Sequence, residues 1–342
     1  MRFGQKTDVG VEKMVNEDAI LVIRWETLAA GGTERFDLVI VADGVGGSVA
    51  GEIASQQTVE AIVERISLAL TSDYRQPTPR ERGRDVGGLL RSAVEWADSR
   101  VRQIVTKNPT FSGMGSALVT GLFHGPWLHV AHLGDCRCYR IHGGSMDQLT
   151  KDHSLVQKLV DLKEITPEEA FRHPNDNVIL RSIGREKPAC VEVHRHRVEA
   201  GDTYLFATDG AVSDIPISSF LALASALPSD PSARDLETLC SRVVEAAKDP
   251  NEGATLDNIS IVAAHVDALA ACAEAHGVDV WRYEGRLRQV ETGVPAHFGA
   301  TFPYGVDSPS FRLNGWKART WALPSTLQGN AEVGRAASEE GR

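Results

Sequence analysis

Several features that would place this chain in a special class are missing from its sequence. Residues 1–5 contain no apolar segment of the kind found in secretory signals, and the most apolar stretch, residues 217–228, is too short to span a bilayer. The net charge is −10, and the sequence shows no clusters of Lys and Arg that would form a basic groove. Sequence-independent nucleic-acid binding needs such clusters. We therefore expect a cytoplasmic protein that binds neither membrane nor nucleic acid.

Cysteine is also scarce. The five cysteines are scattered and form no Cys-x-x-Cys pair, and Cys136 and Cys138 lie in a strand-like segment with both side chains on one face. We interpret the cysteines as small buried thiols rather than as a metal or redox site.

The remaining composition is ordinary. The chain has 342 residues, of which 42% are hydrophobic and 24% are charged, as in a soluble globular protein. This length allows one large domain or two smaller ones, and it is ample for a buried core.

Hydrophobic periodicity predicts two strands, two long amphipathic helices, a run of strands, small helices, further strands, a helix and a last strand. The expected strands are 19–25, 36–42, 117–123, 127–133, 137–141, 191–198, 203–208 and 259–266. The expected helices are 48–70, 86–105, 154–162, one that begins at Thr166, and 236–247, with a polar loop over 71–85. Because strand and helix do not strictly alternate, a largely antiparallel α+β fold is favoured over a doubly wound parallel sheet.

Acidic residues recur in a fixed order along the chain, mostly where apolar runs end. The motifs are Asn16-Glu17-Asp18, Asp43-Gly44-Val45-Gly46-Gly47, Gly134-Asp135, Asp209-Gly210 and Asp257-Asn258. One Asp-Gly pair is weak evidence, because Asp and Gly are favoured in turns. Several carboxylates at strand ends need a compensating charge, since burying each of them alone is costly. One or two hard divalent cations are the simplest candidates.

The order of these motifs resembles that of the metal-dependent protein serine/threonine phosphatases of the 2C type, in their bacterial form. Besides the acidic motifs, the resemblance rests on Thr7-Asp8-Val9-Gly10, Gly51-Glu52, Gly113-Met114-Gly115-Ser116-Ala117, Leu149-Thr150-Lys151-Asp152-His153-Ser154, Arg181-Ser182-Ile183-Gly184 and Gly201-Asp202. It covers roughly residues 5–267.

The resemblance implies an α+β fold, a sandwich of two mainly antiparallel sheets flanked by helix pairs. The two long helices predicted from periodicity agree with it independently. We expect a catalytic domain over residues 1–267. Residues 268–342 are then a C-terminal extension, with a packed part over 268–323 and a disordered end after Ser325.

The resemblance also implies a chemistry: hydrolysis of phosphoserine and phosphothreonine on proteins by a metal-activated water, without a covalent phosphoenzyme. Two Mn²⁺ or Mg²⁺ ions, with a third at a weaker site, would be the cofactors. Asp43, Asp209 and Asp257 would be catalytic, with Asp43 bridging two metals. The implied metal ligands are Glu17, Asp18, Asp43, the Gly44 carbonyl, Asp135, Asp209 and Asp257. Phosphoproteins would be the substrates, and a bacterial Ser/Thr kinase would be the opposing partner.

Lys13 departs from the family pattern, which usually has an Arg at this position to grip the substrate phosphate. Lysine is a point charge rather than a bidentate fork. The alternatives are a phosphatase-fold module that binds phosphoproteins with little or no turnover, and a two-metal phosphodiesterase or nuclease, which the acidic charge disfavours. For His153, a structural hydrogen bond is favoured over a general-acid role. Segment 155–180 matches the flap beside the active site in bacterial members.

Overall fold

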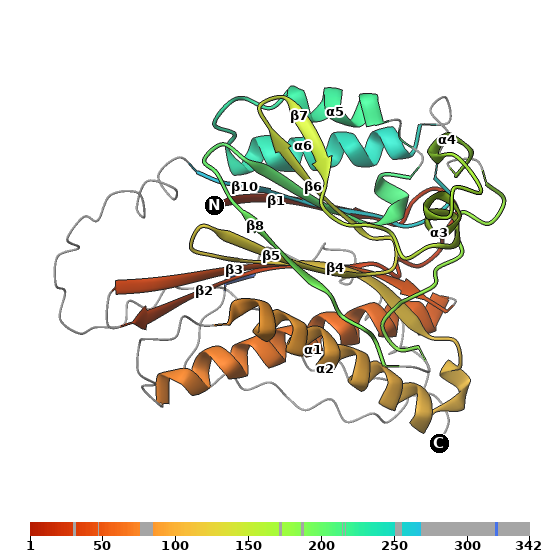
Figure 1. Cartoon of the computed structure of the whole chain (residues 1–342), viewed down its shortest axis with the longest axis horizontal. Coiled ribbons are helices and arrows are strands. Elements are labelled where there is room, and N and C mark those ends of the chain that lie inside the picture. The colour runs from red at the N-terminus through yellow and green to blue at the C-terminus, as the bar shows by residue number, and fades with distance from the viewer. Residues whose placement is uncertain are drawn as a thin grey trace, which may run out of the picture.

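The computed structural model describes residues 1–29, 32–46, 48–75, 85–170, 173–185, 188–213, 215, 217–249, 255–267 and 319–320. Within these residues the strands form two sheets in which every neighbouring pair is antiparallel. The two sheets lie face to face as the central layers of a sandwich (Figure 1).

The first sheet has five strands in the order β1-β10-β9-β6-β7, and the second has six in the order β11-β2-β3-β4-β5-β8. The strands of the first are β1 (Arg2–Asp8), β10 (Ile259–His265), β9 (Thr203–Ala207), β6 (Arg137–His142) and β7 (Ser145–Gln148). Those of the second are β11 (Arg319–Thr320), β2 (Ala19–Ala29), β3 (Gly32–Val45), β4 (Gly115–His124), β5 (Trp127–Leu133) and β8 (Val193–Arg197).

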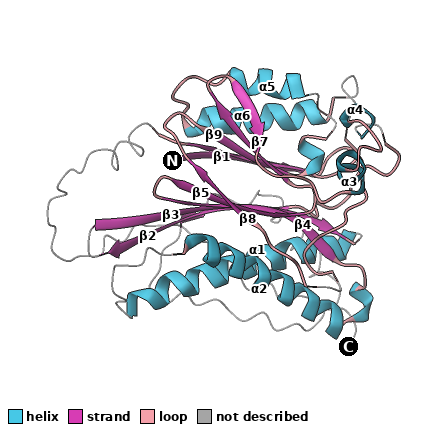
Figure 2. Cartoon of the chain, in the orientation of Figure 1, coloured by secondary structure: helices cyan, strands magenta, loops and turns pink. Residues whose placement is uncertain are grey.

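Helices cover the outer face of each sheet (Figure 2). The long pair α1 (Ser48–Arg75) and α2 (Val86–Lys107) packs on the six-stranded sheet, and α5 (Ile217–Ser225) and α6 (Ala233–Ala247) cover the five-stranded sheet. Two short helices, α3 (Leu155–Asp161) and α4 (Pro167–Ala170), lie at one end of the sandwich. Short 3-10 turns cover Pro109–Phe111 and Asp209–Ala211.

The central strand β3 shows why its sequence is almost continuously apolar. Successive side chains of a strand point to opposite faces. Leu38 and Ile40 pack in the core under α1 and α2, whereas Val39 and Val41 pack in the core between the two sheets. A strand covered on both faces has no position for a polar residue, so the alternation typical of half-exposed strands disappears.

The expected α+β sandwich is confirmed, and so is the expected helix that begins at Thr166. Strands β6 and β7 form a hairpin that turns at Gly143 and Gly144. Thr166 and Glu169 exchange the two hydrogen bonds of a capping box. The polar loop expected over 71–85 is wrong at its start, because α1 continues to Arg75 beyond its last apolar positions.

Strand β1 and helix α5 were not predicted from the sequence. Strand β1 carries few apolar residues, and it forms because it pairs with β10 along its whole length. Gly4 in this strand lies against the backbone of α6 at Leu236, where a Cβ would collide. Helix α5 has only nine residues, three of them serine, which is too short for a clear helical periodicity.

Three of the cysteines, Cys136, Cys138 and Cys240, are buried thiols as expected, whereas Cys190 is exposed, which corrects the expectation for that residue. Cys272 lies outside the described residues.

Of the extension, the structure describes β11, which pairs with β2 at Ile23 and Arg24; the rest of 268–342 lies outside the described residues. None of the helices within the described ranges combines the length and the apolar character needed to cross a membrane.

Candidate metal centre

Three of the acidic motifs meet at one end of the sandwich, between the two sheets. Asp43 lies near the end of β3, Asp135 follows β5 in the turn to β6, and Asp209 begins the 3-10 turn after β9. One carboxylate oxygen from each of these residues lies within 4.8 Å of the others. Residues separated by more than 150 positions in the sequence therefore form one acidic cluster, defined here as Asp43, Asp135 and Asp209.

The cluster is electrostatically costly as it stands. Burial, followed by repulsion from the neighbouring aspartates, raises the pKa of Asp43 well above its usual range, and the same two causes act on Asp135. Burial is also the largest cause that raises the pKa of Asp18 to about 7 and that of Asp209 to about 6. Carboxylates that resist ionisation this strongly require a compensating positive charge to be ionised near neutral pH.

Several carboxylate oxygens in this region have no hydrogen-bond partner. They are Oε1 of Glu17, Oδ1 of Asp18 and Oδ1 of Asp135, and all three are buried. Buried polar atoms are normally paired, so unpaired acceptors gathered in one place are typical of a site that binds a cation. All of the donors are hard oxygen atoms, which are the ligands that Mg²⁺ and Mn²⁺ take. The residues present thus fit divalent metal ions.

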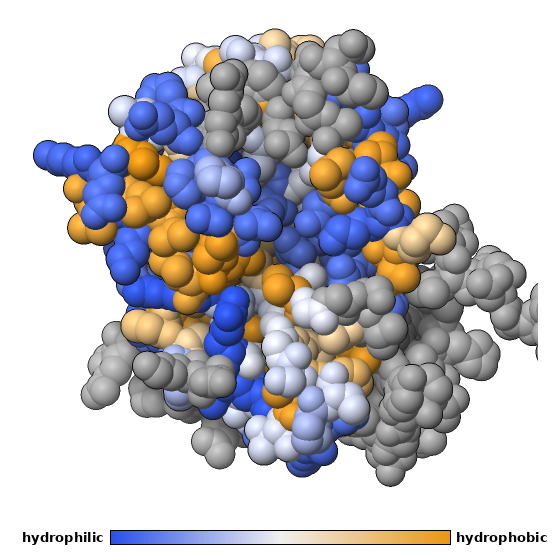
Figure 3. Space-filling view, turned by 90° about the vertical axis from the view of Figure 1, so that its right-hand side faces the viewer, coloured by the Kyte–Doolittle hydropathy of each residue, from blue (hydrophilic) through white to orange (hydrophobic). Residues whose placement is uncertain are grey.

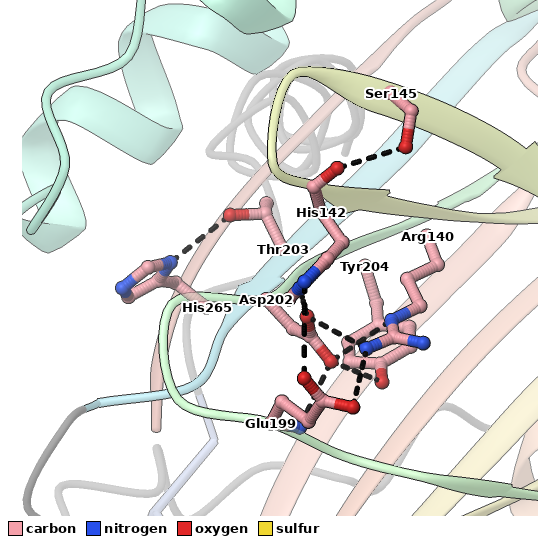
Figure 4. Close-up of polar contacts among 8 residues, drawn as sticks. All are labelled: Arg140, His142, Ser145, Glu199, Asp202, Thr203, Tyr204 and His265. Carbon is pink, nitrogen blue, oxygen red and sulfur yellow. Dashed lines mark hydrogen bonds and ion pairs between the residues drawn. The ribbon is translucent and has the colours of Figure 1, made fainter.

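A buried aspartate at the other end of β9 provides the contrast. Asp202 precedes this strand, and its carboxylate accepts hydrogen bonds from Arg140, His142, Tyr204 and the Glu199 N–H (Figure 4). Both of its oxygens are satisfied by the protein itself, so Asp202 stabilises the fold and needs no metal. In the acidic cluster, in contrast, Oδ1 of Asp135 is buried without a hydrogen-bond partner.

Two glycines allow the backbone to approach the carboxylates closely. A Cβ on Gly44 would collide with the Gly51 carbonyl, and a Cβ on Gly51 would collide with the Glu17 carboxylate. The Gly44 N–H also donates to the Glu17 carbonyl at 3.2 Å. These contacts explain why the sequence has glycine at both positions, after Asp43 and in the first turns of α1.

Lys13 lies beside the predicted metal ligands. Its Nζ is 2.9 Å from Oδ1 of Asp257 and 3.5 Å from Oε2 of Glu17. Burial lowers the pKa of Lys13, but the hydrogen bond and charge of Asp257, with those of Glu17, raise it overall. The side chain of Asp257 is 44% exposed, and this residue does not belong to the cluster of three. Its carboxylate pairs with Lys13, and its charge contributes to the raised pKa values of Asp18, Asp43 and Asp209.

Asn258 has a structural role that was not predicted from the sequence. Its Oδ1 accepts from the Glu17 N–H at 2.8 Å, and its Nδ2 donates to the carbonyls of Val9 and Val15 at 2.9 and 3.1 Å. Asn258 therefore holds the loop that carries Lys13, Glu17 and Asp18 against the start of β10. Its position in the Asp-Asn motif before an apolar strand was the available signal.

His153 holds the turn that carries Asp135. The ring nitrogen Nδ1 of His153 accepts a hydrogen bond from the Gly134 N–H at 3.3 Å. The backbone N–H of His153 donates to the Gly134 carbonyl at 2.8 Å. The imidazole stacks on His132, with ring centroids 4.6 Å apart. Burial, followed by the charges of His132 and Arg181, lowers the pKa of His153 to about 4. A neutral imidazole that accepts a backbone N–H agrees with the structural hydrogen bond favoured from the sequence.

Comparison with known proteins agrees with this geometry. A family model for protein phosphatase 2C matches residues 11–275. The serine/threonine protein phosphatase PstP of Mycobacterium tuberculosis (strain H37Rv) is 34% identical over 268 residues, which is 78% of this chain and 45% of the relative. The chain thus spans less than half of that curated relative's length.

Solved structures give the same result. The crystal structure of the Mycobacterium tuberculosis phosphatase PstP/Ppp is 30% identical, with a TM-score of 0.62, over 78% of this chain and 98% of that one. The catalytic domain of PstP in complex with two manganese ions is 31% identical, with a TM-score of 0.60, over 78% of this chain and 98% of that one.

Proposed function

The chain belongs to the protein phosphatase 2C family, and from this premise we propose that it hydrolyses phosphoserine and phosphothreonine in proteins with the help of bound Mn²⁺ or Mg²⁺. The observation that carries the proposal is the acidic cluster with its unpaired buried oxygens next to Lys13. The structure of the PstP catalytic domain in complex with two manganese ions supports the choice of metal. The substrates are phosphorylated proteins, and the reaction opposes a bacterial Ser/Thr kinase.

We assign the metal ligands by position. Asp43, Asp209 and Asp257 would hold one ion, Asp43 would be shared with a second ion that Glu17 and Asp18 would serve, directly or through water, and the Gly44 carbonyl would be a further ligand. Asp135 would hold a third, weaker ion. Lys13 and the Asn258 N–H both contact Oδ1 of Asp257, so its other oxygen is assigned to the cation. When bound, the metals lower the pKa of a water molecule so that it can attack phosphorus.

The protein's own groups prepare the site for this reaction. Lys13 donates to a phosphate oxygen and compensates its negative charge, while the ion pair with Asp257 keeps the ammonium at the edge of the cluster. Asn258 and Thr208 hold the second set of carboxylates, because Asn258 accepts from the Glu17 N–H and the Thr208 hydroxyl donates to Asp18 at 3.2 Å. No protein nucleophile is required, since the attacking group is water.

The domain boundaries form part of the same proposal. Residues 1–267 make up the catalytic domain, and residues 268–342 form an extension that is packed in part. The pairing of β11 with the edge of β2 supports the packed part.

Phosphate release tests the proposal directly. We expect inorganic phosphate from a phosphothreonine peptide in the presence of Mn²⁺ and none in excess chelator, with Asp209→Asn as the inactive control.

The second candidate is a module that binds phosphoproteins without turnover. It is favoured by Lys13, which is a point donor already paired with Asp257 and Glu17. Peptide binding without phosphate release, measured by fluorescence anisotropy, would support the module and refute the phosphatase.

A further inference from the structure

Three apolar side chains lie exposed beside Lys13. They form the apolar rim, defined as Val11, Met14 and Leu256, with exposed fractions of 52%, 94% and 59%. Apolar residues scattered singly over a surface need no explanation, but a group gathered next to a polar site indicates a binding surface.

The rim belongs to one surface although its residues come from distant parts of the sequence. Val11 and Met14 flank Lys13 in the loop after β1, and Leu256 precedes Asp257. The Lys13–Asp257 ion pair of 2.9 Å and the hydrogen bonds from Asn258 to this loop join the two segments. The rim therefore has a fixed position relative to the predicted metal ligands.

Two further exposed apolar residues belong to a segment that is hydrogen-bonded to the turn carrying Asp135. Val178 and Leu180 are 38% and 46% exposed. The Leu180 N–H donates to the His153 carbonyl at 2.7 Å, and the His153 N–H donates to the Gly134 carbonyl next to Asp135. In Figure 3, which faces this end of the molecule, hydrophobic residues gather on both sides of a recessed hydrophilic band.

The charges around the rim restrict what can bind there. Glu12 is exposed between Val11 and Lys13, so an acidic side chain in this place would be repelled. Lys13 is the cation of this loop, and its position at the cluster suits a phosphate group. In an extended peptide each residue rises about 3.3 Å, so side chains one to three residues from a bound phosphoresidue lie about 3–10 Å away, within reach of the rim.

We propose that the apolar rim binds an apolar side chain within three residues of the phosphoresidue, so that the preferred substrates are phosphorylated segments with apolar neighbours. This inference rests on the phosphatase function proposed above and specifies its substrate class. Burying part of an exposed methionine and leucine removes apolar surface from water, which supports a preference of about tenfold in kcat/KM.

Two phosphothreonine peptides that differ in the flanking residues test this preference. One has Leu on both sides of the phosphothreonine, and the other has Gly. We expect the wild-type protein with Mn²⁺ to favour the Leu peptide about tenfold in kcat/KM, and the double variant Met14→Ser/Leu256→Ser to reduce this ratio to near one. Leu68→Ser is the matched control, because Leu68 is 55% exposed on α1, and its ratio should equal the wild-type ratio.

Each result decides between the possibilities. A wild-type ratio near one, or a ratio that the double variant leaves unchanged, overturns the proposal. Loss of a dimer in the double variant, measured by analytical ultracentrifugation together with an unchanged ratio, assigns the rim to a second copy of the chain. If neither peptide releases phosphate, the phosphatase function fails instead. Equal affinities of the two peptides by anisotropy then overturn the rim as well, whereas a tenfold difference sustains it.

Discussion

The substitution Asp43→Asn distinguishes the effect of the acidic cluster on the stability of the metal-free fold from its role in phosphate hydrolysis. Burial, followed by repulsion from Asp18, Asp209 and Asp135, raises the pKa of Asp43. Asparagine has almost the same shape but carries no charge. We therefore expect the variant to lose phosphatase activity and, without metal, to be more stable than the wild-type protein.

The size of the gain follows from the neighbouring carboxylates. The pKa of Asp18 rises from 3.8 to about 7, and at about 1.36 kcal/mol per unit its ionisation costs the metal-free fold roughly 4 kcal/mol above pH 7. Burial is the largest cause of this shift, and its repulsive part comes from Asp209 and Asp257. The repulsion between Asp18 and Asp43 raises the pKa of Asp43, so Asn at position 43 removes that repulsion together with the cost of ionising a buried Asp43. We expect a gain of about 1–2 kcal/mol, or a rise of roughly 2–6 °C in Tm.

The gain depends on pH in a defined direction. The folded-state pKa values of Asp18 and Asp209, about 7 and about 6, lie above the ordinary aspartate value of 3.8, so the folded metal-free protein keeps protons that the unfolded chain releases. Their contribution to stability is complete below about pH 4 and is lost as the pH rises to about 7. The Asp43→Asn gain should consequently be larger at pH 8 than at pH 5.

Thermal unfolding in excess chelator at pH 5 and pH 8 measures this effect, and repeating it with Mn²⁺ measures the loss of metal stabilisation. Asp147→Asn, at an exposed position in β7, is the control for removing one negative charge from the surface. A metal-free Asp43→Asn protein that is less stable than wild type at pH 8 would refute the repulsion. Substantial Mn²⁺-dependent turnover in the variant would remove Asp43 from the centre of the reaction.

Three further predictions address other parts of the chain. Lys13→Ala should raise KM for a phosphothreonine peptide several-fold with a smaller change in kcat, because a contact made equally in the ground and transition states is uniform binding; an unchanged KM would mean that Lys13 does not touch the substrate. Truncation after Asp267 should lower Tm or cause aggregation while Mn²⁺ binding persists, because it removes the strand paired with β2; a truncated enzyme of equal stability, solubility and activity would make the extension a tether. Asp98→Ala should cost roughly 2–3 kcal/mol in urea unfolding, since the buried carboxylate accepts from the N–H groups of Gly184 and Ala189; a cost below about 0.5 kcal/mol would contradict this role.

Most of the helices and strands were predictable, because local periodicity reports which side of an element is buried. The two long helices and the apolar β3 carry strong patterns and were recognised, but α1 continues beyond its expected end, and β3 extends beyond the expected 36–42 on both sides, from Gly32 to Val45. Strand β1 was missed because its stability comes from β10 and α6, which are more than 200 residues away in sequence. Local patterns contain no information of that kind.

The candidate site was predictable in part for a similar reason. The motifs around Asp43, Asp135 and Asp209 could be recognised as a set because glycines and strand ends accompany them. Asn258 carries no charge, and although its place in the Asp-Asn motif marked it, the motif does not show that its side chain joins two segments of the chain. The contact of Lys13 with Asp257 was also out of reach, since the two residues lie in different segments of the chain.

The sequence by itself determined the family, the succession of helices and strands, and the oxygen-rich set of groups suited to divalent metals, because these depend on residue type and short-range spacing. The tertiary structure alone decided which carboxylates lie within 4.8 Å of one another, which of their oxygens stay unpaired, and that Asp202 is fully satisfied whereas Asp135 is not. The physical reason is that electrostatic cost depends on distance and burial. Both are set by how two antiparallel sheets pair and pack across the whole chain.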